Sequence, residues 1–177
     1  MATTTPEQEL DAVRLETLNL LITFHVYRHA FTVFAESLQR SRHHVYCGLV
    51  TIKALEHDLI LRLCRLVDDK RTDHSLHRAL LAVRAGLGEQ RARKIDRMLD
   101  DYHNTLKPLK ERRDEQIAHL AKLKAEPGQP TEDIRADVIA QVVRIVDAIC
   151  QSEICYSMKL GSQEPEVDVR AEVLGRG

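Results

Sequence analysis

The segment from Arg113 to His119 combines side chains that can act on a phosphodiester. It begins with Arg113-Asp114 and reaches His119 after five intervening residues. Histidine can transfer protons near neutral pH, and an arginine guanidinium can hold a phosphate and the charge that develops on it. Asp114 is expected to orient the arginine or to cap a helix. Because RNA can be cut without a metal when its own 2′-hydroxyl attacks the adjacent phosphorus, these residues predict metal-independent RNA cleavage.

The same stretch carries a local excess of positive charge. Residues 107–124 hold six basic residues against three acidic ones, a balance of +3 in a chain whose formal net charge is -1. Because basic side chains bind phosphate oxygens, we predict RNA contacts at Lys110, Arg112 and Lys122. A solvated helix face with internal ion pairs is the alternative interpretation. The near-neutral total excludes a wholly basic surface that coats nucleic acid, so any such contact is local.

Helix geometry leaves open which arginine works with His119. On a regular helix, six residues at about 100° each place Arg113 and His119 on faces roughly 120° apart. Arg112, seven residues before His119, lies almost directly along its face. Either Arg112 is the partner, or Arg113 projects from an irregular helix start, or the groups meet across a two-fold dimer. We predict a symmetric homodimer, which would also gather positive charge around a groove.

Two sequence patterns resemble a known superfamily. Arg113-Asp114 followed by His119 resembles the Arg-polar-x(4–6)-His signature of the HEPN superfamily of helical ribonuclease and interaction domains. Upstream, the sequence LRLCRLVD at 61–68, followed by a polar loop and Ser75-Leu76, resembles the AbiU2-like branch of that superfamily. Together the two patterns cover roughly residues 45–125.

The resemblance implies a function and partners. It implies an endoribonuclease that acts on RNA as a toxin or phage-defence effector, pairs as a dimer and has an antitoxin protein as a possible partner. Some HEPN toxins carry a tyrosine two residues after the histidine, where a partner enzyme modifies them. Ala121 stands at that place, which argues against this form of control. The alternative is a non-catalytic helical module for dimerisation or partner binding, in which Arg113 and His119 no longer cut.

Periodicity predicts an all-α fold. Apolar residues recur at three- and four-residue steps along nearly the whole chain, and aromatic residues make up only 4% with no Trp. Pro108 is expected to end a helix or kink it. The predicted fold is a compact bundle of about five or six helices. The helices are expected at about residues 6–38, 41–66, 75–87, 89–106, 109–123 and 131–158, with the second, fourth and last supplying most of the core.

The chain length fits one domain. We assign residues 1–160 to a single helical domain and expect a flexible C-terminal tail over residues 161–177, although Val167 and Val169 alternate as a strand would. Residues 125–130 (AEPGQP) are predicted to be a linker.

The remaining features predict a cytoplasmic protein without a metal or cofactor. The N-terminus lacks the pattern of a signal peptide, and no apolar run is long enough to span a bilayer. The four cysteines lie singly and are expected to be buried free thiols. His74 and His77 are interpreted as exposed histidines at a helix start, and Asp68 and Asp69 as solvated loop acids, so no metal site is predicted.

Overall fold

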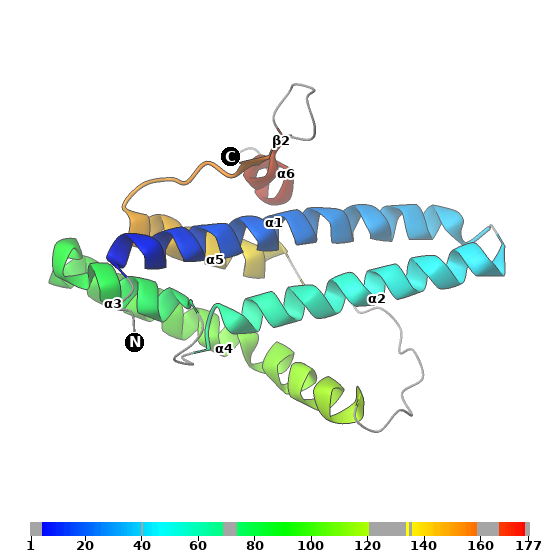
Figure 1. Cartoon of the computed structure of the whole chain (residues 1–177), viewed down its shortest axis with the longest axis horizontal. Coiled ribbons are helices and arrows are strands. Elements are labelled where there is room, and N and C mark those ends of the chain that lie inside the picture. Colours follow the sequence, from blue (N-terminus) through cyan, green and yellow to red (C-terminus); the bar gives the residue numbers. More distant parts are fainter. Residues whose placement is uncertain are drawn as a thin grey trace.

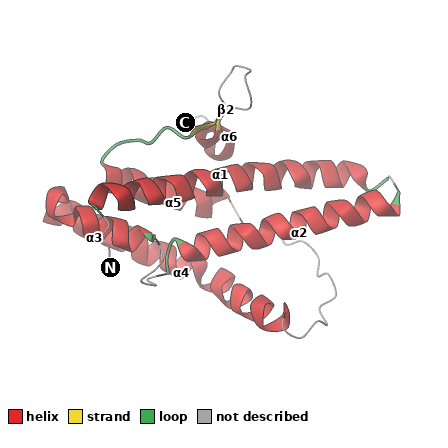
Figure 2. Cartoon of the chain, viewed as in Figure 1, coloured by secondary structure: helices red, strands yellow, loops and turns green. Residues whose placement is uncertain are grey.

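The computed structural model describes residues 5–39, 41–68, 74–120, 134, 136–158 and 167–175, without the side chains of residues 37, 116–120 and 158. Within these ranges the chain forms six α-helices and one pair of two-residue strands (Figures 1 and 2). The prediction of an all-α bundle is confirmed. In chain order the elements are α1 Pro6–Ser37, α2 Arg42–Arg65, α3 Leu76–Leu87, α4 Glu89–Leu120, α5 Ala136–Cys150, β1 Ser157–Met158, β2 Val167–Asp168 and α6 Val169–Leu174.

The first two helices form a long hairpin (Figure 1). A capping box starts α1: the Thr5 side chain accepts a hydrogen bond from the Gln8 amide at 3.3 Å, and the Gln8 side chain accepts one from the Thr5 amide at 2.9 Å. Near the far end of the hairpin the two helices approach closely at Gly48. A Cβ atom added there would lie 2.7 Å from the ring of Phe34. The absence of a side chain at Gly48 therefore permits this approach.

The first helix is central to the packing. It contacts α2, α3, α5 and α6, and Leu20 and Leu21 at its middle are completely buried. Between α3 and α4 the chain turns at Gly88, whose φ of 74° lies in the region that favours glycine. This turn places α3 and the first part of α4 at the open end of the hairpin, where α1 begins and α2 ends (Figure 1). The core is therefore shared by all the long helices, with α1 contributing alongside the three expected to dominate.

Of the two effects expected of Pro108, the structure shows the kink and not a helix end, so the prediction of separate helices over 89–106 and 109–123 is wrong (Figure 1). The helix α4 runs from Glu89 to Leu120 with Pro108 inside it. A proline within a helix lacks an amide donor and its ring crowds the preceding turn, which bends the axis. Figure 1 shows α4 changing direction between its green first part and its yellow-green last part. Arg113 and the main chain of His119 therefore belong to the second part of one bent helix.

The last long helix is shorter than the predicted 131–158. Among the described residues it extends from Ala136 to Cys150, and Gln151 then adopts a left-handed φ of 58°. The Asp147 carboxylate accepts a hydrogen bond from the Ile154 amide at 2.9 Å, which stabilises the turn that follows. A local side-chain acceptor thus competes with continuation of the helix.

Part of the expected C-terminal tail packs on the bundle. The strands β1 and β2 pair antiparallel, with Ser157 opposite Asp168, and α6 follows directly. Val169 and Val173 of α6 are buried, and Arg170 forms an ion pair with Asp147 at 2.9 Å. A flexible tail was predicted because the segment has few apolar residues to bury. In the structure, Val169 and Val173 are sufficient to pack α6 on the bundle.

The cysteines are free, but most are not buried. Cys64 is buried, Cys150 is half-buried, and Cys47 and Cys155 are exposed, so the expectation of buried thiols is correct only for Cys64. In the part of the chain that the structure describes, no helix has the length and apolar character needed to cross a membrane.

Candidate active site

Arg113 lies on the second part of α4, against the C-terminal end of α2. Its side chain is only 19% exposed. Its Nε donates a hydrogen bond to Asp114 Oδ1 at 2.9 Å, and its Nη1 donates one to Asp68 Oδ2 at 2.9 Å. Among the described residues, Nη2 has no hydrogen-bond partner. The two carboxylates therefore fix the plane of the guanidinium and leave one nitrogen available to a ligand.

Asp68 receives two cations. Besides Arg113, the Nζ of Lys110 lies 3.2 Å from Asp68 Oδ1. Partial burial by itself raises the pKa of the Asp68 carboxyl, but the hydrogen bonds from Arg113 and Lys110 outweigh burial and leave its pKa below the usual value. For Arg113, burial by itself lowers the pKa, and the bonds to Asp114 and Asp68 reverse that effect, so the net pKa is raised. Asp68 and Arg113 are therefore charged together over a wide range of pH.

The neighbouring residue, Arg112, is held by a different carboxylate. Glu56 of α2 is completely buried, and its Oε1 accepts a hydrogen bond from Arg112 Nη2 at 2.8 Å. Lys53, one turn earlier on α2, places its Nζ 3.4 Å from Glu56 Oε2. A buried carboxylate is tolerated only when cations and donors surround it. Arg112, predicted to contact RNA, thus has a partner within the fold.

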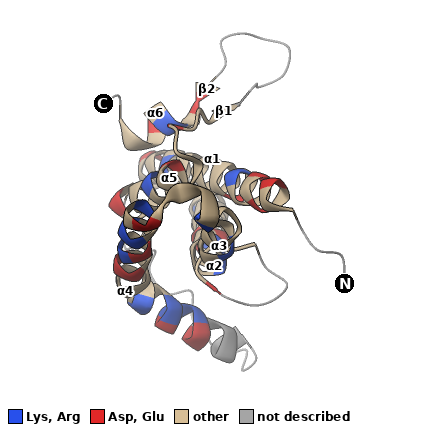
Figure 3. Ribbon diagram, turned by 90° about the vertical axis from the view of Figure 1, so that its left-hand side faces the viewer, with Lys and Arg blue, Asp and Glu red and all other residues tan. Residues whose placement is uncertain are grey.

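The structure brings three of the predicted residues, Lys110, Arg113 and Asp114, together around Asp68. At this junction of α2 and α4, cations face carboxylates, and three of the six basic residues of the segment 107–124, Lys110, Arg112 and Arg113, pair with acids. The residues of the junction are Lys53, Lys110, Arg112, Arg113, Glu56, Asp68 and Asp114. Figure 3 shows the same alternation of basic and acidic residues along α4. The alternative of a solvated helix face with i,i+4 ion pairs does not describe these residues, because Lys110, Arg112 and Arg113 pair with Asp68 and Glu56, outside α4, and these side chains are at most 19% exposed.

Asp68, Glu56 and Lys53 belong to this junction but were not among the site residues predicted from the sequence. Asp68 was expected to be a solvated loop acid, and Glu56 is one acid among many on an amphipathic helix. Their partners on α4 are 45 and 56 residues away in the chain. Sequence spacing carries no signal for pairs at that separation.

The other predicted residues are described only in part. The main chain of His119 belongs to α4, but its side chain lies outside the described residues, and so does the whole of Lys122. Because α4 begins at Glu89, Arg113 lies well inside the helix, and the alternative of an irregular helix start does not apply. The catalytic and RNA-binding roles of these side chains stay predictions.

Comparison with known protein families assigns most of the chain to one family. The model of the AbiU2 family within the HEPN group matches residues 7–152 of the chain. The chain belongs to the AbiU2 family of HEPN proteins. The resemblance seen in the sequence is thereby confirmed, and the range matched to AbiU2 contains Arg113, His119, and the two carboxylates that hold α4. Comparison with the curated proteins and with the solved structures gave no match.

Proposed function

We propose that this AbiU2-family protein is a metal-independent endoribonuclease that uses Arg113 and His119. The observation that carries the proposal is the guanidinium of Arg113, fixed by Asp68 and Asp114 at 2.9 Å each, on the helix that continues to His119. A cation whose orientation is set before substrate arrives can stabilise developing charge without reorganising, which is the main source of electrostatic catalysis. Asp114 therefore acts as an orienting residue in this scheme.

The proposed reaction needs one proton acceptor and one proton donor. His119 accepts the proton of the RNA 2′-hydroxyl while that oxygen attacks the adjacent phosphorus. The bond from phosphorus to the 5′-oxygen breaks, and a second imidazole in its protonated form donates a proton to that leaving oxygen. The products are a 2′,3′-cyclic phosphate and a 5′-hydroxyl. Arg113 Nη2 faces the charge that develops on the phosphorane oxygens.

The proposal includes a symmetric homodimer. Positions 113 and 119 of a regular helix lie on faces roughly 120° apart, so a second copy is a direct way to supply the missing proton donor near Arg113. The biological role that accompanies this activity is that of a toxin or phage-defence effector, restrained by an antitoxin protein. Toxicity on expression, relieved by a neighbouring gene, would support that role.

The decisive experiment measures RNA cleavage by the purified chain in EDTA, with structured and unstructured RNA. Arg113→Ala and His119→Ala should each lower the cleavage rate by about 10²–10⁴-fold, which is the usual effect of removing a proton-transfer group or charge stabiliser. Two matched controls, His103→Ala on the exposed side of α4 and Arg65→Ala at the end of α2, should cleave at the wild-type rate. Cleavage that is equal in all variants would identify a contaminating nuclease and refute the assignment.

A second candidate function has its own supporting observation. Lys110, Arg112 and Arg113 all pair with carboxylates of the same chain, as expected when an ion-pair network joins two helices. This arrangement suits a non-catalytic module that binds a partner protein. Folded wild-type chain that cuts neither class of RNA, yet binds a partner protein tightly, would favour this candidate.

A further inference from the structure

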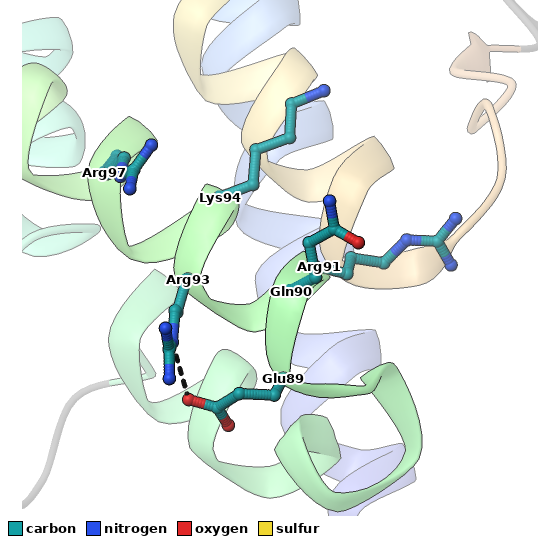
Figure 4. Close-up of a pocket in the computed structure, with 6 residues that line it drawn as sticks. All are labelled: Glu89, Gln90, Arg91, Arg93, Lys94 and Arg97. Atoms are coloured by element: carbon teal, nitrogen blue, oxygen red, sulfur yellow. Dashed lines mark hydrogen bonds and ion pairs between the residues drawn. The ribbon is translucent and has the colours of Figure 1, made fainter.

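The first turns of α4 carry a dense group of exposed basic residues, far along the helix from Arg113. Arg91, Arg93, Lys94 and Arg97 are all exposed, and we call them the α4 basic patch. Together with Glu89 and Gln90 they line a hollow of about 750 Å³ (Figure 4). Ala92 and Ile95, between them in sequence, are buried, so packing of the opposite side of the helix holds the basic side chains toward solvent.

The cations of this patch differ from those at the candidate active site in their partners. Arg93 pairs with Glu89 at 2.9 Å, whereas Arg91 donates to the neutral side-chain oxygen of Gln151 at 2.6 Å. Within the described part of the chain, no carboxylate lies within ion-pair distance of Lys94 or Arg97.

The nearest acid along the helix does not neutralise the patch. Asp96 accepts two hydrogen bonds from Arg84 of α3, at 3.1 and 2.9 Å, and is thereby engaged elsewhere. Three of the four patch cations therefore have no acidic partner among the described residues. A polyanion that binds these three cations breaks no ion pair with an acid of the described chain. A polyanion that binds Arg113 must compete with Asp68 for the guanidinium.

The arrangement of the side chains indicates the shape of the ligand. In Figure 4, Arg91, Lys94 and Arg97 extend from α4 in diverging directions and do not converge on one point. A single phosphate is bound best by donors that converge on it, whereas cations spread along a helix suit the successive phosphates of a chain. Measured along the bent axis of α4, Arg97 and Arg113 lie about 24 Å apart at 1.5 Å per residue.

From these observations we propose that the α4 basic patch binds the phosphate backbone of RNA as a second contact, separate from the candidate active site. The proposal rests on the proposed function for the identity of the polyanion. It assigns sequence-independent affinity to the patch, because phosphate contacts carry no base information. Binding should therefore weaken steeply as salt concentration rises.

The test measures RNA binding by fluorescence anisotropy over a range of salt concentrations, in full-length chain that carries His119→Ala so that the probe stays intact. The patch variant is Arg91→Gln/Lys94→Gln/Arg97→Gln. The matched control, Arg28→Gln/Arg42→Gln/Arg65→Gln, removes the same charge from exposed positions on α1 and α2. Circular dichroism verifies that both variants are folded.

The patch variant should lower the slope of log affinity against log salt by about 2, at about 0.7 for each single-strand phosphate that is no longer neutralised. If affinity at about 1 M salt is unchanged, this corresponds to about a hundredfold weaker binding at about 0.1 M salt. The control variant should keep the slope of the parent. Equal slopes and affinities in the patch and control variants would overturn the proposal.

Two further arms separate other ligands and the proposed function. If inorganic phosphate displaces RNA at equal phosphate concentration, the patch is a small-anion site and the proposal is overturned. If polyglutamate binds the patch more tightly than RNA does, the ligand is an acidic protein and the proposal is likewise overturned. If the wild-type chain never cuts RNA but the patch variant loses RNA binding, the proposed function is refuted and the proposed role of the α4 basic patch is supported. If the wild-type chain cuts RNA but the patch variant binds RNA as tightly as its parent, the proposed role of the patch is refuted and the proposed function is kept.

Discussion

The guanidinium of Arg113 and the carboxylate of Asp68 are joined by a hydrogen bond of 2.9 Å across 45 residues of sequence. This hydrogen bond ties the second part of α4, beyond Pro108, to the segment that directly follows α2. Lys110 adds a second link to the same carboxylate at 3.2 Å. Asp68 therefore joins Glu56, the partner of Arg112, in setting the position of the candidate active site relative to the bundle.

The pH dependence of stability should show this role of Asp68. Since its pKa is lowered in the folded chain, the ionised carboxylate stabilises the fold at pH values above the unfolded pKa of about 3.9. That stabilisation is lost as the pH falls through the lower, folded pKa. Asp68→Asn should therefore unfold at lower urea concentration than wild type at about pH 7, and the two should converge once the pH falls below the folded pKa of Asp68. A difference that does not change with pH would contradict the role assigned to this carboxylate.

The buried Glu56 should make Arg112 a structural residue. Arg112→Ala removes the guanidinium at 2.8 Å from the buried carboxylate and leaves the ammonium of Lys53 at 3.4 Å, and it is expected to lower the free energy of unfolding by about 3 kcal/mol. In a Glu56→Gln background the same substitution should cost about 2 kcal/mol less, because no buried charge is then left behind.

Arg65→Ala provides the control for that cycle. Arg65 is 56% exposed and lies 4.0 Å from Glu16, so its loss should change the free energy of unfolding by about 0.5 kcal/mol or less. Urea denaturation of the five proteins measures all the terms. If Arg112→Ala leaves stability unchanged and weakens RNA binding instead, Arg112 contacts RNA, as predicted from the sequence.

Two helical glycines should respond in opposite ways to alanine. Gly86 of α3 has open space where a Cβ atom would lie, so Gly86→Ala should stabilise the chain by about 0.5–1 kcal/mol through helix propensity. At Gly48 the added Cβ would meet the Phe34 ring at 2.7 Å, and Gly48→Ala should be destabilising. Thermal unfolding measures both, and a Phe34→Ala background should remove the penalty at Gly48. Equal stabilisation by both alanines would show that the hairpin is not closely packed there.

The C-terminal segment should contribute to stability through α6. Val173 is 3% exposed, and Val173→Ala is expected to lower the free energy of unfolding by about 2 kcal/mol through the loss of two buried methyl groups. Val50→Ala on α2, where the valine is 50% exposed, removes the same groups at little cost and serves as the control. Urea midpoints that shift equally for both would show that α6 does not pack on the bundle.

The sequence by itself determined the helical class, most helix starts and the family. Apolar periodicity at three- and four-residue steps depends only on local geometry, and so do the caps at Thr5 and Ser75. The Arg113-to-His119 spacing and the pattern over residues 61–76 are likewise local properties, and together they indicated the HEPN resemblance that the match over residues 7–152 confirmed.

Only the tertiary structure decided which residues hold Arg112 and Arg113. Their carboxylate partners, Glu56 within α2 and Asp68 just beyond its end, come from a distant part of the chain, and many other acids were equally eligible by sequence. The same holds for burial: Leu15 and Leu38 fit the apolar pattern of the first helix yet are 59% exposed. Periodicity specifies a face, but the neighbour that covers it, and the distant charge that meets a given side chain, are set by how the helices pack.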